Sequence, residues 1–178
     1  MVAGQAVGAA EGKWQGGKEL PDAKLGWATL NKSGGHTGHG HSFCAVRRWT
    51  SEVDCRVAIN GVIGHQQDMG DGVRLRIFHS RLGILQDVVA ENAMSPVAAA
   101  PFDIRAGESI NFVVDCRTNE SHDSFRSKFV ITQSVDGKVL RGWNSEDDFR
   151  DQPGASRLDA WAQLAQALLL TNEFVFVD

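Results

Sequence analysis

The stretch that most constrains the fold is residues 107–125, where an alternating run of apolar side chains leads into an acidic, amide-rich loop. Apolar side chains stand at Ile110, Phe112 and Val114, whereas the positions between them are mixed. Alternation of this kind puts successive side chains on opposite faces of a β-strand, so one face of the stretch is wholly apolar. Such a face has to be covered by a second layer, which favours a strand of a β-sandwich.

Similar short runs, separated by turn signals about every 8–12 residues, continue along the chain and are typical of an all-β sandwich. The predicted strands are 14–20, 26–30, 42–50, 53–60, 73–79, 84–89, 97–104, 110–115, 124–132 and 139–140. The runs 42–50 and 53–60 resemble a hairpin pair, and Asp136-Gly137 is a hairpin turn. Pro96 and Pro101 restrict 97–104 to an edge strand, because proline cannot donate to a sheet ladder. Four glycines among residues 33–41 predict a loop there.

The sequence divides into three parts. Residues 1–12 are a flexible Gly/Ala-rich segment, 13–141 form the sandwich, and 142–178 comprise an acidic linker, an amphipathic helix and an apolar tail. The helix is predicted near 157–170, where Ser156 and Asp159 resemble a capping box and apolar residues follow at helical spacing. Its apolar stripe predicts self-association or docking through this helix.

Composition excludes several functional classes. The formal net charge of −4 argues against electrostatic binding to nucleic acid or to anionic membranes. No apolar run approaches the roughly 18–20 residues that a membrane span needs, so no membrane insertion is expected. No signal-peptide pattern stands at the N-terminus. Catalytic motifs such as Gly-x-Ser-x-Gly or His-Glu-x-x-His are also missing from the sequence, so we expect a protein that is not an enzyme.

Three segments carry a resemblance to known proteins. Residues 112–115 followed by Asn119 and 123–125, the run 70–77, and 34–36 with 46–49 resemble strands of galactose-binding-like jelly-roll domains, over roughly residues 14–133. Such domains are similar to carbohydrate-binding modules, and this pattern is typical of large secreted planctomycete-type proteins that also carry c-type cytochrome and helical domains. The segment 161–174 resembles the C-terminal end of those proteins. The resemblance implies a jelly-roll β-sandwich with a C-terminal α-helix, exported to the periplasm or outside the cell within a larger parent.

The function that the resemblance implies is binding of a polysaccharide or glycan without catalysis. A sugar site combines hydrogen-bonding groups with one aromatic plane. We place it at the loop 33–41 and its neighbours, with the following candidates: Trp27 or Trp49 as the platform, and His36, Arg48, Asp71 and Asp123 as polar partners. Either tryptophan can instead be a core residue. The alternative function is a docking module of the cytochrome-containing parent that has no glycan ligand.

Two metal sites are conceivable from the residue types. Calcium takes oxygen ligands from loops, and Asp115, Asn119 and Asp123 offer them, so a structural calcium is one expectation. The alternative is that the two aspartates only cap turns. The three imidazoles of His36, His39 and His41 could chelate a transition metal. Because the segment is rich in glycine, a flexible polar loop without metal is the favoured interpretation.

The three cysteines, Cys44, Cys55 and Cys116, form an odd set, so at least one thiol is unpaired in a monomer. Cys44 and Cys55 lie on successive predicted strands and could pair if their side chains face each other. Three small buried side chains without a disulfide are the other possibility.

Overall fold

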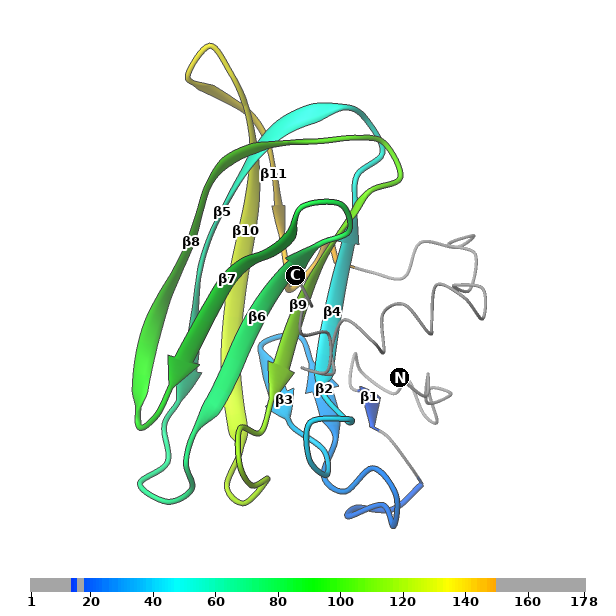
Figure 1. Cartoon of the computed structure of the whole chain (residues 1–178), viewed down its shortest axis with the longest axis vertical. Helices are drawn as coiled ribbons and strands as arrows, with labels where there is room; N and C mark the ends of the chain where they lie inside the picture. Colours follow the sequence, from blue (N-terminus) through cyan, green and yellow to red (C-terminus); the bar gives the residue numbers. More distant parts are fainter. Residues whose placement is uncertain (1–13, 16–17, 150–178) are drawn as a thin grey trace, which may run out of the picture.

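The computed structural model describes residues 14–15 and 18–149, and within them the chain is a sandwich of two antiparallel β-sheets (Figure 1). These residues contain no α-helix. The strands are β1 (Trp14–Gln15), β2 (Thr29–Asn31), β3 (Gly34–His36), β4 (Ala45–Thr50), β5 (Cys55–His65), β6 (Val73–His79), β7 (Gly83–Ala90), β8 (Ala93–Ile104), β9 (Ser109–Asp115), β10 (Ser124–Val135) and β11 (Lys138–Asn144). The all-β prediction and the two-layer arrangement are therefore confirmed.

The larger sheet has seven strands in the order β1-β2-β3-β10-β5-β8, with β11 also paired to β10. Along one side β10 pairs with β5, from Arg126 to Gln133. Along its other side, β3 pairs with the beginning of β10 and β11 with its end. The long strand β10 is thus the element that joins the β2–β3 corner to the rest of the sheet (Figure 1).

The smaller sheet has four strands in the order β4-β9-β6-β7. Its inward side chains meet those of the larger sheet in one hydrophobic core, in which Phe112 of β9 stacks on Phe129 of β10 with ring centroids 4.5 Å apart. Ile110, Leu75 and Ile77 are fully buried in this core. The alternation that predicted an apolar face on β9 therefore identifies the core face of that strand.

Several local predictions are confirmed. The Asp136-Gly137 turn joins β10 to β11, and both residues have the positive φ that such a turn requires. Strand β8 lies at the end of the sheet order, as Pro96 and Pro101 predicted, although it begins at Ala93.

Two predictions about the N-terminal half are wrong. The runs 42–50 and 53–60 are not a hairpin pair, because β4 and β5 belong to opposite sheets and the segment between them crosses from one layer to the other. Residues 34–36 are not in a loop but form β3, which pairs with both β2 and β10. Glycine disfavours strands through its conformational entropy, and here the pairing on both sides of β3 overrides that preference.

The cysteines do not form the Cys44–Cys55 disulfide. Cys44 precedes β4 and Cys55 opens β5 beyond the other end of that strand, and all three cysteines are free. The Cys44 thiol instead contacts the carbonyl oxygen of His41 at 3.0 Å. Burial raises the pKa of Cys44 to about 12 and that of Cys116 to about 11, so both remain thiols at neutral pH.

The predicted flexible segment 1–12 and the predicted helix near 157–170 lie outside the described residues, as does most of the region 142–178. Docking or self-association through that helix stays a prediction. Within the described residues, no helix is long and apolar enough to cross a membrane.

Candidate binding groove

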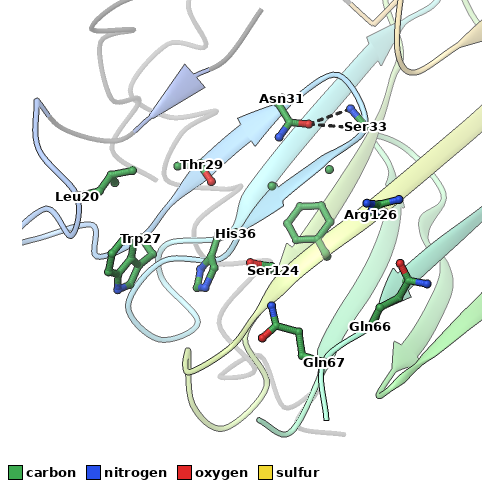
Figure 2. A pocket seen from close by; sticks show the side chains of 14 residues that line it. Leu20, Trp27, Thr29, Asn31, Ser33, His36, Gln66, Gln67, Ser124 and Arg126 are labelled. Carbon is green, nitrogen blue, oxygen red and sulfur yellow. Dashed lines mark hydrogen bonds between the residues drawn. The ribbon is translucent and has the colours of Figure 1, made fainter. Parts of the chain in front are cut away.

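An open groove of about 830 Å³ lies beside β2, β3, β10 and the end of β5 (Figure 2). Small and polar residues dominate its lining. The lining residues are Leu20, Trp27, Thr29, Asn31, Ser33, Gly34, Gly35, His36, Gly64, Gln66, Gln67, Ser124, Phe125 and Arg126. Its volume lies within the range of about 300–1,000 Å³ that is usual for small-ligand sites.

Strand register explains how residues far apart in sequence meet here. In one row across the sheet, Arg126 of β10 pairs with Gly34 on one side and with Gly64 on the other. In the next row, Ser124 pairs with His36, which in turn pairs with Thr29. Directly opposite residues share a face of the sheet. The polar side chains of both rows therefore line the same groove.

Two glycines of β3 allow the strands to approach closely. A Cβ built on Gly34 would lie 2.0 Å from the Phe125 carbonyl oxygen, and one on Gly35 would lie 2.1 Å from the Thr29 carbonyl oxygen. Both distances are impossible for a side chain without a backbone shift. The absence of side chains at these positions keeps this part of the groove open.

Trp27 forms the aromatic wall of the groove. The Asp22 carboxylate accepts hydrogen bonds from the backbone N–H groups of Lys24 and Leu25, and Gly26 then takes a φ of +63°. This tight turn presents Trp27 with 46% of its surface exposed. The indole lies against the His36 ring, with centroids 6.3 Å apart and planes tilted by 47° (Figure 2). The predicted residues Trp27 and His36 are thus brought together.

The hydrogen bonding of His36 defines what it can offer a ligand. Its Nδ1 donates to the Thr37 carbonyl oxygen at 2.7 Å, because a carbonyl can only accept. Burial lowers the pKa of His36 below its usual value, so the ring is neutral at neutral pH. Nε2 of the neutral ring is then a hydrogen-bond acceptor.

Trp49 and Arg48 lie elsewhere. Trp49 is 5% exposed and packs against Trp143 with ring centroids 4.9 Å apart, so it is a core residue rather than a platform. Arg48 belongs to β4 in the smaller sheet, where its Nε donates to the Asn111 side-chain oxygen at 2.7 Å. Sequence spacing could not show that β4 belongs to the smaller sheet, whereas the groove lies on the larger one.

Asp71 joins two loops rather than facing the groove. Its carboxylate accepts the backbone N–H of Thr118 at 3.0 Å, the hydroxyl of the same threonine, and the Asn119 side-chain amide at 3.2 Å. Because all these bonds run between loops 70–72 and 117–119, Asp71 has a structural part in holding them together.

Asp123 is fully buried. Its Oδ2 accepts the Thr37 hydroxyl at 3.0 Å, and its Oδ1 has no hydrogen-bond partner among the described residues. Burial raises the pKa of Asp123 to about 7, and the nearby carboxylates of Asp71 and Glu120 act in the same direction. A carboxyl without solvent access cannot contact a sugar in the groove.

Two of the three predicted calcium ligands, Asp115 and Asn119, already accept hydrogen bonds from the protein. Oδ2 of Asp115 accepts Arg76 Nη2 at 2.7 Å and Arg74 Nε at 3.3 Å, and its Oδ1 accepts the Arg117 backbone N–H at 3.0 Å. The Asn119 side-chain oxygen accepts the Ser121 N–H at 3.0 Å. Binding of calcium through Asp115, Asn119 and Asp123 would require Asp115 to give up its arginines, and it stays a prediction.

The three imidazoles of the 36–41 loop have separate partners. His39 Nδ1 lies 2.7 Å from a Glu120 oxygen, and His41 Nδ1 lies 3.7 Å from Asp115 Oδ1. His36 is bonded to a backbone carbonyl. Across the described residues, no group of three or more His, Cys, Asp or Glu side chains is arranged to hold a metal ion.

Sequence reasoning did not name several polar lining residues, among them Asn31, Gln66, Gln67 and Arg126. Arg126 occupies an outward position of the alternating run 124–132, which was the available signal for an exposed side chain. What the sequence could not show is that β3 pairs with the start of β10 and so brings these residues to one groove.

A scan against protein-family models finds no match to this chain, and no curated protein sequence matches it either. Among solved structures, the chain is similar to the crystal structure of a Podospora anserina GH26-CBM35 β-(1,4)-mannanase, with 14% sequence identity and a TM-score of 0.38. The match covers 70% of this chain and 25% of that chain, so it spans about a quarter of the mannanase. A likeness at this TM-score carries no argument about ligand or activity.

Proposed function

We propose that this chain is a carbohydrate-binding module that holds a glycan in the Trp27 groove without transforming it. The observation that carries the proposal is a half-exposed indole at the wall of an open groove lined by hydrogen-bonding side chains. Sugars present an apolar ring face and several hydroxyl groups, so they need this combination. Trp27 is the stacking platform in this proposal.

The hydroxyl groups of the sugar would be bound by the residues around the indole. His36 Nε2 accepts a hydrogen bond, and the side-chain amides of Asn31, Gln66 and Gln67 can donate and accept. Figure 2 shows the two glutamines on the segment that follows β5, across the groove from Asn31. A sugar exchanges hydrogen bonds with water for hydrogen bonds with protein at little net gain, so we expect dissociation constants of about 10⁻³ to 10⁻⁵ M.

Binding without hydrolysis is supported by the lining of the groove. Glycoside hydrolysis generally uses a pair of carboxyl groups on either side of the scissile bond. The described residues that line the groove include neither Asp nor Glu.

Finer features of the proposal rest on the sequence resemblance. We propose that the sandwich is a jelly roll of the galactose-binding type, that a helix follows it near 157–170, and that the module belongs to a larger exported protein.

A second candidate is the docking module. One observation favours it: Val135, Val139 and Leu140, at the tip of the β10–β11 hairpin, are 50%, 65% and 63% exposed. A cluster of exposed apolar side chains is a typical protein-interaction surface. Replacement of Val139 and Leu140 by lysine, followed by size-exclusion chromatography, tests self-association; an unchanged elution volume would count against an interface between copies at this hairpin.

Calorimetry against a panel of polysaccharides tests the proposed glycan binding. We expect Trp27→Ala to weaken binding about ten-fold or more, because loss of an aromatic platform costs on the order of 1–2 kcal/mol. Leu140→Ala is the matched control, since Leu140 is also exposed and apolar but lies on the distant hairpin. No binding of any polysaccharide at millimolar concentration would favour the docking module.

A further inference from the structure

Arg126 lines the groove, and no described residue pairs with it. It points outward from β10, and it forms no hydrogen bond or ion pair with another described residue. The next outward residue on the same strand, Lys128, behaves differently, because its ammonium lies 2.9 Å from a Glu146 oxygen. Arg81 is likewise paired, 2.6 Å from Glu108.

Arg126 is exposed, and the strands on either side of it place glycines opposite its side chain. Its directly opposite neighbours are Gly34 on β3 and Gly64 on β5, neither of which has a side chain. Beyond Gly64, the Met94 side chain of β8 leans over the glycine, since a Cβ there would lie 2.0 Å from the Met94 sulfur. The described residues directly opposite Arg126 on the sheet therefore provide no counter-ion.

The described lining of the groove carries a positive charge at neutral pH. His36 and Arg126 are the two ionisable side chains among the described lining residues, and His36 is neutral because burial lowers its pKa. No described lining residue thus compensates the charge of the arginine, although the whole chain has a formal net charge of −4. An arginine presents a planar fork of N–H donors that matches two oxygens of a carboxylate or a sulfate ester.

We infer that the glycan held in this groove is anionic and that a carboxylate or sulfate group of the sugar pairs with Arg126. This inference rests on the proposed function and specifies the class of glycan. Trp27 and Arg126 lie toward opposite sides of the groove in Figure 2, so one sugar unit stacks on the indole while the anionic group of the same chain reaches the guanidinium.

A matched pair of polysaccharides isolates the contribution of the charge. Polygalacturonate and its methyl ester have the same backbone, and only the first carries free carboxylates. A sulfated galactan and its desulfated form make the corresponding comparison for sulfate. We expect the wild-type chain to bind at least one of the two anionic polymers about ten-fold more tightly than its neutral counterpart, because a charge-assisted hydrogen bond exceeds a neutral one. Which pair shows the preference identifies the anionic group.

Arg126→Gln keeps a hydrogen-bonding side chain but removes the charge. This variant should lose the preference for the anionic polymer over its neutral counterpart, and Arg126→Lys should retain part of that preference. Lys128→Gln is the control, because it removes a neighbouring charge that is already paired. Equal wild-type binding of anionic and neutral polymers, or a preference that survives in Arg126→Gln, would overturn the inference but leave the proposed function standing. Binding of none of the four polymers or of the wider panel would overturn both.

Discussion

Removal of the Arg76 guanidinium is expected to destabilise the fold strongly. Asp115 and Arg76 are 0% and 6% exposed, and their charged atoms lie 2.7 Å apart. Replacement of Arg76 by methionine preserves most of the side-chain length but leaves the carboxylate buried. Loss of one partner of a buried ion pair costs about 3–5 kcal/mol, because the remaining charge is uncompensated.

The second arginine reduces this cost. Arg74 Nε lies 3.3 Å from the same Asp115 oxygen and is partly exposed, so some compensation remains in Arg76→Met. We therefore expect the free energy of unfolding to fall by about 3 kcal/mol, at the lower end of the range for a broken buried ion pair. For a chain of 178 residues, this corresponds to a fall in melting temperature of roughly 6–12 °C.

Urea denaturation followed by tryptophan fluorescence at pH 7 measures the effect. Arg56→Met is the matched control, because Arg56 pairs with Asp103 at 3.0 Å but both side chains are more than half exposed. Exposed pairs contribute at most about 1 kcal/mol. A loss in Arg76→Met no larger than that in Arg56→Met would refute the stabilising role of the buried pair.

Three further predictions concern backbone approach, pH and calcium. Gly34→Ala should lower the free energy of unfolding by about 1–3 kcal/mol, because the new Cβ would collide with the backbone of β10. The control Gly142→Ala, whose nearest contact lies at 3.8 Å, should change this free energy by less than about 0.5 kcal/mol, and equal effects of the two variants in urea denaturation would contradict the close packing of β3. Burial lowers the pKa of His79, so the stability that this neutral ring contributes is present above its ordinary pKa of about 6.5 and is lost as pH falls below that value. The raised pKa of Asp123 changes stability with pH in the opposite direction, so we compare wild type with His79→Asn, in which the contribution of Asp123 is the same. The difference between the two proteins in the slope of unfolding free energy against pH should vanish above pH 7. Identical slopes at all pH values would contradict the prediction. If calcium binds through the predicted ligands, the melting temperature must rise with free calcium and Asp123→Asn must abolish the rise, whereas equal melting curves in EDTA and in millimolar calcium would remove the site.

Alternation along single strands was the part of the fold that sequence could predict. The apolar positions of β9 and the Asp136-Gly137 turn depend on local periodicity and turn chemistry, which are readable within a few residues. The pairing of strands was not readable in this way. Consecutive runs such as β4 and β5 resemble a hairpin whenever a short polar segment joins them, yet here the chain crosses between sheets.

The site was predicted only in part for the same reason. Trp27 and His36 are close in sequence and both face the groove, so local reasoning found them. Arg126 and Gln66 enter only through the register of β10 with β3 and the end of β5. Trp49 was proposed as a platform because a tryptophan in the core and one on the surface have the same sequence signature.

The proposed site at Trp27 is tested most directly by nuclear magnetic resonance of the indole N–H groups during titration with a bound polysaccharide fragment. The chain contains five tryptophans, and Trp27→Phe assigns the resonance in question. We predict that the Trp27 indole resonance shifts with ligand, together with the side-chain amides of Gln66 and Gln67, while those of the buried Trp49 and its neighbour Trp143 move little. Shifts confined to the β10–β11 hairpin, with the Trp27 resonance unmoved at saturation, would contradict the account.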